Sequence, residues 1–121
     1  MGTRRKLHPV ARLLEALEKE DIRFMLIGMS AAIVQGVMES TLDVDLWVDL
    51  SPRQYMRAQN VAIKTGGTMG ANTVAYLEDG TPVNFVFGDV AGLSPFAIEF
   101  KNTRRLNFRG KRIPVLKLER I

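Results

Sequence analysis

The chain has 121 residues, of which 46% are hydrophobic and 25% are charged, as in globular proteins that bury one hydrophobic core. It contains no cysteine, which excludes disulfide bonds and thiolate metal sites. Its apolar segments are shorter than the roughly 20 residues that cross a bilayer, and no signal peptide is visible. We therefore predict a cytoplasmic protein without a membrane partner, folded as a single domain over residues 1–121.

The formal net charge of +4 is unevenly distributed along the sequence. Residues 101–121 hold eight basic side chains and one acidic side chain, Glu119, so the first hundred residues carry a negative net charge. A basic segment that faces an acidic site can guide a polyanion such as a nucleotide or RNA. Alternatively, these charges belong to a solvated hairpin, where they keep an edge strand from aggregating.

The first predicted elements are two helices with a strand between them. Apolar residues recur with helical spacing at Val10, Leu13, Leu14 and Leu17. This spacing predicts an amphipathic helix with Pro9 in its first turn, and His8 becomes a cap or a surface residue. Residues 22–27 are almost all apolar, as expected of a strand covered on both faces. Small and apolar residues at 31–38 predict a short helix.

The second predicted strand spans residues 43–49, and its alternation separates two faces. We expect one face to be buried, and its members are Val44, Leu46, Val48 and Leu50. On the other face we expect Trp47 to pack against the fold and Asp49 to lie at the surface. Ser51 is a typical N-cap in front of a proline, so it predicts a helix, which the glycines at 66–67 end.

Two strand pairs are predicted in the second half of the chain. Residues 73–87 predict a hairpin with a two-residue turn at Asp79-Gly80. Residues 104–116 predict another pair around Gly110. One face of the first hairpin carries Val83, Phe85 and Phe87, and the other carries Asn84 and Val86.

The rest of the second half gives weaker signals. We expect an irregular stretch at residues 89–103 and the start of a helix at residues 117–121. Strands and helices that follow one another in this way predict an α/β (α+β) fold, in which helices flank a mixed β-sheet.

A glycine turn and two carboxylates carry the chemical information of this sequence. Gly28 follows the predicted strand at 22–27 and precedes the predicted helix at 31–38. Asp43 and Asp45 are two positions apart on the next strand, so they share a face, about 7 Å from each other. Carboxylates bind a divalent cation, while the N–H groups of a helix N-terminus bind phosphate. The pattern predicts phosphoryl or nucleotidyl transfer.

The motif Ile27-Gly28-Met29, followed after a helix by Asp43-Val44-Asp45, resembles that of the nucleotidyltransferase superfamily, which includes polymerase beta and antibiotic nucleotidyltransferases. With Gly36 and Thr41, the sequence is more similar to small bacterial stand-alone nucleotidyltransferase-like proteins, including relatives of the toxins of abortive-infection (toxin–antitoxin) systems. The likeness covers residues 13–121, and it implies the nucleotidyltransferase fold.

The resemblance also implies a binding site for Mg²⁺ and a nucleoside triphosphate. Asp43 and Asp45 would ligate two Mg²⁺ ions, as in two-metal catalysis. Gly28, Met29 and Ser30 would cradle the phosphates. The implied reaction transfers a nucleoside monophosphate to an acceptor hydroxyl and releases pyrophosphate. The sequence leaves the acceptor open among RNA, protein and small molecule.

Three residues depart from the pattern of the resembled family. Met29 replaces a glycine or serine, Glu39 replaces a basic residue that is frequent there, and Asn84 occupies the position of a third catalytic carboxylate. An amide cannot accept a proton, and general-base catalysis is worth about 10² to 10⁴ in rate. Three hypotheses remain: a nucleotidyltransferase of weakened activity, a non-catalytic nucleotide-binding or regulatory module that works with a partner protein or as a homodimer, and an RNA-binding module that uses the basic C-terminal strands.

Overall fold

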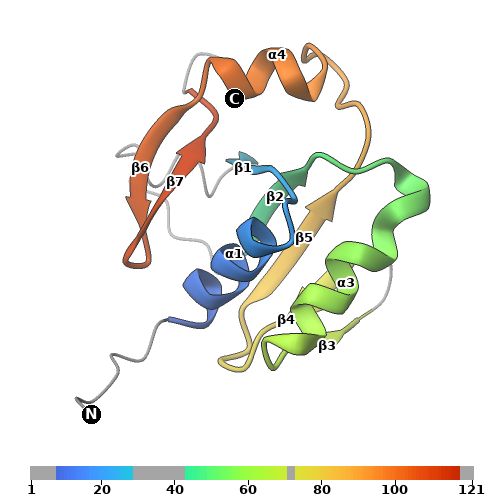
Figure 1. Ribbon diagram of the computed structural model, residues 1–121, viewed down its shortest axis with the longest axis vertical. Coiled ribbons are helices and arrows are strands. Elements are labelled where there is room, and N and C mark those ends of the chain that lie inside the picture. Colours follow the sequence, from blue (N-terminus) through green and yellow to red (C-terminus); the bar gives the residue numbers. More distant parts are fainter. Residues whose placement is uncertain (1–7, 29–42, 71–72, 118–121) are drawn as a thin grey trace.

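The computed structural model describes residues 8–28, 43–70 and 73–117 (Figure 1). Its elements in chain order are α1 (Pro9–Lys19), β1 (Phe24–Ile27), β2 (Val44–Val48), the 3₁₀ helix η1 (Pro52–Gln54), α3 (Tyr55–Lys64), β3 (Thr68–Met69), β4 (Val74–Tyr76), β5 (Pro82–Val86), α4 (Phe96–Lys101), β6 (Arg104–Phe108) and β7 (Lys111–Val115). Some predicted features lie outside the described residues; these are Met29, Ser30, Gly36, Glu39, Thr41, the predicted helix at 31–38 and residues 118–121 of the predicted C-terminal helix.

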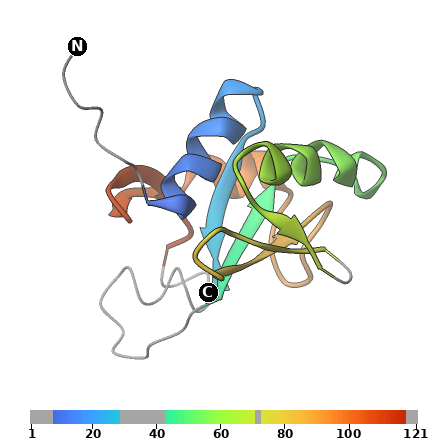
Figure 2. The same ribbon diagram turned by 90° about the horizontal axis from the view of Figure 1, so that it is seen from below.

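Within the described ranges, seven strands form one mixed sheet in the order β3-β4-β5-β2-β1-β7-β6. β2 runs parallel to β5 and β1 runs parallel to β7, whereas the other neighbours are antiparallel. Helices α1 and α3 cover one face of the sheet (Figures 1 and 2). Residues of α4 pack against the opposite face. The predicted fold class, a mixed sheet flanked by helices, is confirmed.

Helix α1 forms as its sequence predicts. Pro9 occupies the first turn, and the Nδ1 atom of His8 accepts a hydrogen bond from the backbone N–H of Val10 at 3.1 Å. The predicted role of His8 as a cap is therefore confirmed. The apolar stripe is buried against the sheet, and it comprises Val10, Ala11, Leu13, Leu14 and Leu17.

The main core lies between the sheet and helices α1 and α3. The predicted inner face of β2 enters this core, as do alternate residues of the neighbouring strands; the set includes Phe24, Leu26, Val44, Leu46, Val48, Val83, Phe85, Ile113 and Val115. Most of these side chains are fully buried. The alternation predicted for β2 and β5 is thus confirmed, and it fixes which side chains lie on the opposite face.

A second, smaller core covers part of the opposite face. Trp47 is completely buried there, its ring lies edge-on to Phe96 of α4 at 5.2 Å between centroids, and its Nε1 donates to the Gly88 carbonyl at 2.8 Å. Arg23 stacks on Phe96 and Phe100. The prediction that Trp47 packs rather than binds a base is confirmed. The prediction of an irregular stretch at 89–103 is wrong at α4.

The two hairpins turn differently, although both contain an X-Gly pair. Phe108 pairs with Lys111, and both residues of the intervening loop, Arg109 and Gly110, have positive φ, +55° and +87°, as a two-residue type I′ turn requires. In the other hairpin, Leu77 pairs with Thr81, so the loop has three residues and ends at Gly80, whose φ is +86°. The predicted two-residue turn at Asp79-Gly80 is therefore wrong. This loop is a turn followed by a glycine bulge.

The remaining described elements complete the sheet and its cover. The helix predicted after Ser51 begins with the 3₁₀ turn η1 and continues as α3 to Lys64. The short edge strand β3 was not predicted. None of the helices in the described ranges is long and apolar enough to span a bilayer.

Candidate functional site

Four of the six predicted site residues lie in the described part of the chain, and three of them meet at one end of the central strands. Gly28 follows β1, Asp45 lies in β2, and Asn84 lies in β5. β2 is hydrogen-bonded to both of the other strands. The antiparallel register places Ile27 opposite Asp45, so Gly28 directly follows the residue that faces this carboxylate.

Asp45 and Asn84 occupy paired positions on the parallel strands β2 and β5. The Nδ2 atom of Asn84 donates a hydrogen bond to Oδ1 of Asp45 at 3.1 Å, and both residues are half-buried. A carboxylate acceptor makes this bond stronger than one between neutral groups. Asn84 thus holds Asp45 in place from the neighbouring strand, which is where the sequence pattern predicts a third catalytic group.

Gly28 approaches Asp45 from the other side. A Cβ atom added at Gly28 would lie 2.6 Å from Oδ2 of Asp45, closer than non-bonded atoms can be. The φ angle of Gly28 is +67°, in the left-handed region that favours glycine. Position 28 therefore requires glycine for two independent reasons: its backbone conformation and the space that the carboxylate occupies.

Asp43 immediately precedes β2 and is exposed. Strand alternation places it on the same side as Asp45. No cluster of three His, Cys, Asp or Glu side chains with metal-binding geometry occurs in residues 8–28, 43–70 and 73–117. Mg²⁺ is usually held by one or two protein carboxylates together with substrate phosphates. Asp43 and Asp45 fit this requirement, and Gly28 leaves the backbone beside Asp45 without a side chain.

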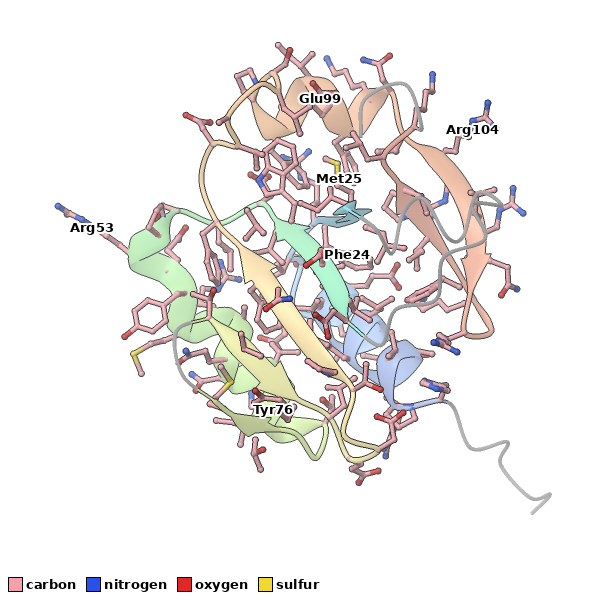
Figure 3. The ribbon with its side chains drawn as sticks, turned by 180° about the vertical axis from the view of Figure 1, so that it is seen from behind. Phe24, Met25, Arg53, Tyr76, Glu99 and Arg104 are labelled. Carbon is pink, nitrogen blue, oxygen red and sulfur yellow. The ribbon has the colours of Figure 1, made fainter. Side chains whose placement is uncertain are left out.

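Phe96 of α4 packs on Trp47, two residues after Asp45 on the same face, and in the view from behind β2 and β5 run on beyond α4 (Figure 3). Val74 pairs with Asn84 across the hairpin, and Tyr76 lies two residues further on the same face. We call the surface formed by Asp45, Asn84, Val74 and Tyr76 the open face. Tyr76 is 44% exposed. Sequence reasoning missed it, because the predicted two-residue turn would pair Tyr76 with Val83 on the buried face, whereas the observed register pairs it with Pro82.

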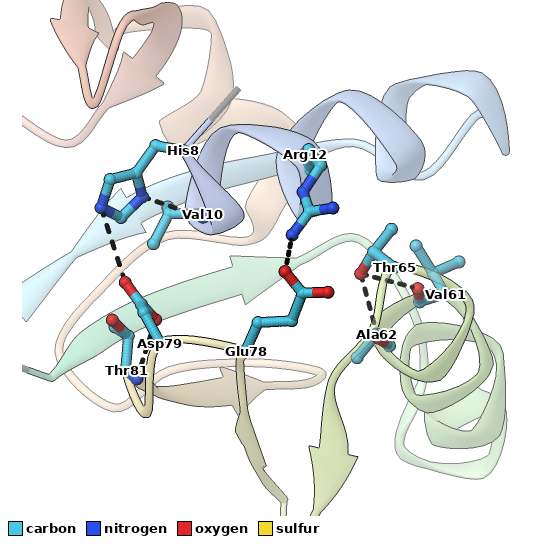
Figure 4. A network of polar contacts seen from close by, with 9 residues as sticks. All are labelled: His8, Val10, Arg12, Val61, Ala62, Thr65, Glu78, Asp79 and Thr81. Atoms are coloured by element: carbon cyan, nitrogen blue, oxygen red, sulfur yellow. Dashed lines mark hydrogen bonds and ion pairs between the residues drawn. The ribbon is translucent and has the colours of Figure 1, made fainter. Parts of the chain in front are cut away.

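A polar network fixes the hairpin that carries Asn84 to the start of α1 (Figure 4). Arg12 forms an ion pair with Glu78, and Nε2 of His8 lies 3.6 Å from Oδ2 of Asp79. Burial acts to raise the pKa of Asp79, but hydrogen bonds from Thr81 and the charge of His8 outweigh it and hold that pKa below the ordinary value of 3.8. The network helps to set the position of β5 relative to the helices.

Comparisons with known proteins support the same fold. No family model and no curated protein matches the chain. The structure of TM1012 from Thermotoga maritima, a protein suggested to be a nucleotidyltransferase, has a TM-score of 0.61 and 17% sequence identity to this chain. The alignment covers 95% of this chain and 82% of TM1012. The lincosamide antibiotic adenylyltransferase LnuA, solved with lincomycin bound, has a TM-score of 0.63 and 12% identity. Its alignment covers 95% of this chain and 84% of LnuA.

The antibiotic-resistance factor ANT(2'')-Ia gives a similar result. Its complex with adenylyl-2''-tobramycin matches 93% of this chain with 15% identity and a TM-score of 0.64. The chain spans 65% and 69% of the length of ANT(2'')-Ia in its two structures. The protein therefore has the nucleotidyltransferase fold, and the resemblance seen in the sequence is confirmed at the level of the fold.

Proposed function

We propose that the protein binds a Mg²⁺–nucleoside triphosphate and transfers the nucleoside monophosphate to an acceptor hydroxyl. The arrangement of Asp45 carries this proposal: one carboxylate oxygen accepts from Asn84 and the other lies against Gly28. A new bond forms between the acceptor oxygen and the α-phosphorus. The bond from the α-phosphorus to the bridging oxygen breaks, pyrophosphate leaves, and the acceptor proton passes to solvent.

Each residue of the site has a distinct role in this proposal. Asp43 and Asp45 would hold the Mg²⁺ ions predicted from the sequence. When bound, these ions neutralise the triphosphate and make the acceptor hydroxyl a better nucleophile. Asn84 orients Asp45 through its hydrogen bond. The absence of a side chain at Gly28 lets phosphate oxygens approach the backbone beside Asp45.

Two solved proteins with the same fold support the reaction class. LnuA is a lincosamide antibiotic adenylyltransferase, and ANT(2'')-Ia was solved with adenylyl-2''-tobramycin. At 12% to 17% identity this likeness concerns the fold, so the acceptor of the present protein is open among small molecules, proteins and RNA.

A second candidate function is non-catalytic nucleotide binding. Asn84 favours it, because its amide donates to Asp45 and cannot take up the acceptor proton. A module of this kind would bind Mg²⁺ and nucleotide, and would act through a partner protein or a second copy of the chain.

The transfer reaction is tested with triphosphates labelled at the α-phosphate. We expect the wild-type protein to transfer the label of at least one of the four nucleotides to an acceptor in a mixture of RNA, protein and small hydroxyl compounds, and to release unlabelled pyrophosphate. Asp45→Asn should lose this activity, while its unfolding midpoint should stay near that of the wild type because the amide oxygen can still accept from Asn84. Mg²⁺-dependent binding without pyrophosphate release would favour the second candidate.

A further inference from the structure

A continuous row of neighbouring residues crosses the strands β1, β2, β5 and β4 and ends just after β3. Ile27 of β1 pairs with Asp45 of β2, and Asp45 pairs with Asn84 of β5. Asn84 pairs in turn with Val74 of β4. The N–H of Gly70, just after β3, donates to the Val74 carbonyl at 2.9 Å. Neighbouring strands lie about 4.8 Å apart, so the four steps of this row span about 19 Å.

The row ends at Gly70 on one side, and Gly28 directly follows its other end, Ile27; a side chain occupies the space beside each of these two glycines. At one end the carboxylate of Asp45 lies against Gly28. At the other end, a Cβ added to Gly70 would lie 2.4 Å from Cε2 of Tyr76. The Tyr76 ring therefore lies against the Gly70 backbone, and a larger residue at position 70 would displace it.

Tyr76 differs from the other aromatic rings near the open face. Trp47 and Phe96 are buried, whereas Tyr76 is 44% exposed and lies on β4 in the view from behind (Figure 3). Among the described aromatic residues, Tyr55 has a similar exposure of 42%. Tyr55 is the first residue of α3, the helix that packs on the opposite face of the sheet. A ring that rests on backbone and faces solvent can stack on a planar ligand at little entropic cost.

We propose that the base of the donor nucleoside triphosphate stacks on Tyr76, with its triphosphate at Gly28 and Asp45 and its ribose over Val74. This inference rests on the proposed function and adds the means of base recognition. An extended nucleoside triphosphate is close in length to the row. Val74 is half-buried and gives the sugar an apolar floor. Because every base has a π-face, stacking of this kind is tolerant of base identity.

The test compares Mg²⁺-dependent binding of ATP and of tripolyphosphate, which lacks the base and the ribose, by calorimetry. Tyr76→Ala should weaken ATP binding by about 5- to 150-fold, the range that one base–aromatic stack supplies, and should leave tripolyphosphate binding unchanged. Tyr76→Phe keeps the ring and should bind ATP within about twofold of the wild type, a change well below one stack. Tyr55→Ala is the matched control and should change neither affinity.

The outcomes separate this inference from the function on which it rests. If Tyr76→Ala binds ATP as tightly as the wild type does, the proposed stacking on Tyr76 is wrong. It is also wrong if Tyr76→Ala loses affinity for ATP and for tripolyphosphate to the same extent. If Asp45→Asn binds tripolyphosphate as the wild type does, or if the wild type binds neither ligand, the proposed function fails first. The affinities of the wild type and of Asp45→Asn for tripolyphosphate test the proposed function without Tyr76, because this ligand has no base to stack.

Discussion

The two faces of β2 show how one strand serves both the core and the candidate site. Leu46 is completely buried beneath α1 and α3. Its neighbour Asp45 lies on the other face, half-buried, and contacts Asn84 and Gly28. Two residues after Asp45 and on the same face, Trp47 is again fully buried, under Phe96. This face of β2 is therefore polar at Asp45 and packed under α4 at Trp47, and changes at Asp45 should alter binding more than folding.

The largest expected effect concerns the open face. Asn84→Asp places a carboxylate opposite Asp45 and supplies a group that can accept the acceptor proton. If the protein is a weakened nucleotidyltransferase, turnover should rise by about 10² to 10⁴, the usual contribution of a general base. Pyrophosphate release under saturating Mg²⁺ and nucleotide measures this change. Asn84→Ala is the control, since it removes the amide without adding a base, and a similar gain in that variant would contradict the explanation.

Changes on the opposite face of β2, which carries Leu46, should instead lower the stability of the fold. Leu46→Ala removes a fully buried side chain and should lower the free energy of unfolding by about 2 to 5 kcal/mol. Asp45→Asn, one residue away, should lower it by less than about 1 kcal/mol, because it keeps the shape and a hydrogen-bond acceptor. Urea unfolding followed by the fluorescence of Trp47, the single tryptophan, measures both. An equal decrease in the free energy of unfolding in both variants would contradict the division of β2 into a packing face and a site face.

Gly28 and Gly110 give a matched pair with similar backbones and different surroundings. Their φ angles are +67° and +87°, but an added Cβ would meet Asp45 only at Gly28 and would meet nothing within 4 Å at Gly110. Both alanine variants should lose about 1 to 2 kcal/mol of stability from left-handed strain. Gly28→Ala should in addition weaken Mg²⁺–ATP binding at least about tenfold, or about 1.4 kcal/mol.

Calorimetry on the two glycine variants checks this difference. An affinity in Gly28→Ala equal to that of Gly110→Ala would show that the close approach of Gly28 to Asp45 has no role in binding.

The smallest effect is expected at the network that joins α1 to the β4–β5 loop. Hydrogen bonds from Thr81 and the charge of His8 hold the folded-state pKa of Asp79 below 3.8. The stability gained from its carboxylate is thus complete well above pH 3.8 and disappears as the pH falls through the lower folded-state pKa. Asp79→Asn should cost less than about 1 kcal/mol at neutral pH. The two unfolding curves should converge in acid, and a constant difference would contradict this account.

The sequence predicts the centre of the molecule better than its margins. The alternation of β2 and the glycine at position 28 follow from local patterns, and the resemblance to the nucleotidyltransferases implies the place of Asn84. The structure brings these positions near one another. Helix α4 has only six residues, and its position depends on contacts of Phe96 with Trp47 and Arg23. Such long-range contacts leave no periodic signal, so this element was missed.

Tyr76 was missed for a related reason. Its proposed role depends on which part of this sheet face α4 leaves uncovered and on the approach of Gly70 to its ring. Neither feature can be read from a three-residue strand. The turn at Asp79-Gly80 also shows a limit of local patterns, because Thr81 pairs with Leu77 and lengthens the loop by one residue.

The central claim is that Asp45, held between Gly28 and Asn84, forms part of a Mg²⁺–nucleotide site. The most direct test is a calorimetric titration of each of the four nucleoside triphosphates into the wild-type protein and into Asp45→Asn, with and without Mg²⁺. We predict binding to the wild type that requires Mg²⁺ and is lost in Asp45→Asn. Failure of every nucleotide to bind the wild type, or Mg²⁺-dependent binding that persists unchanged in Asp45→Asn, would contradict the claim.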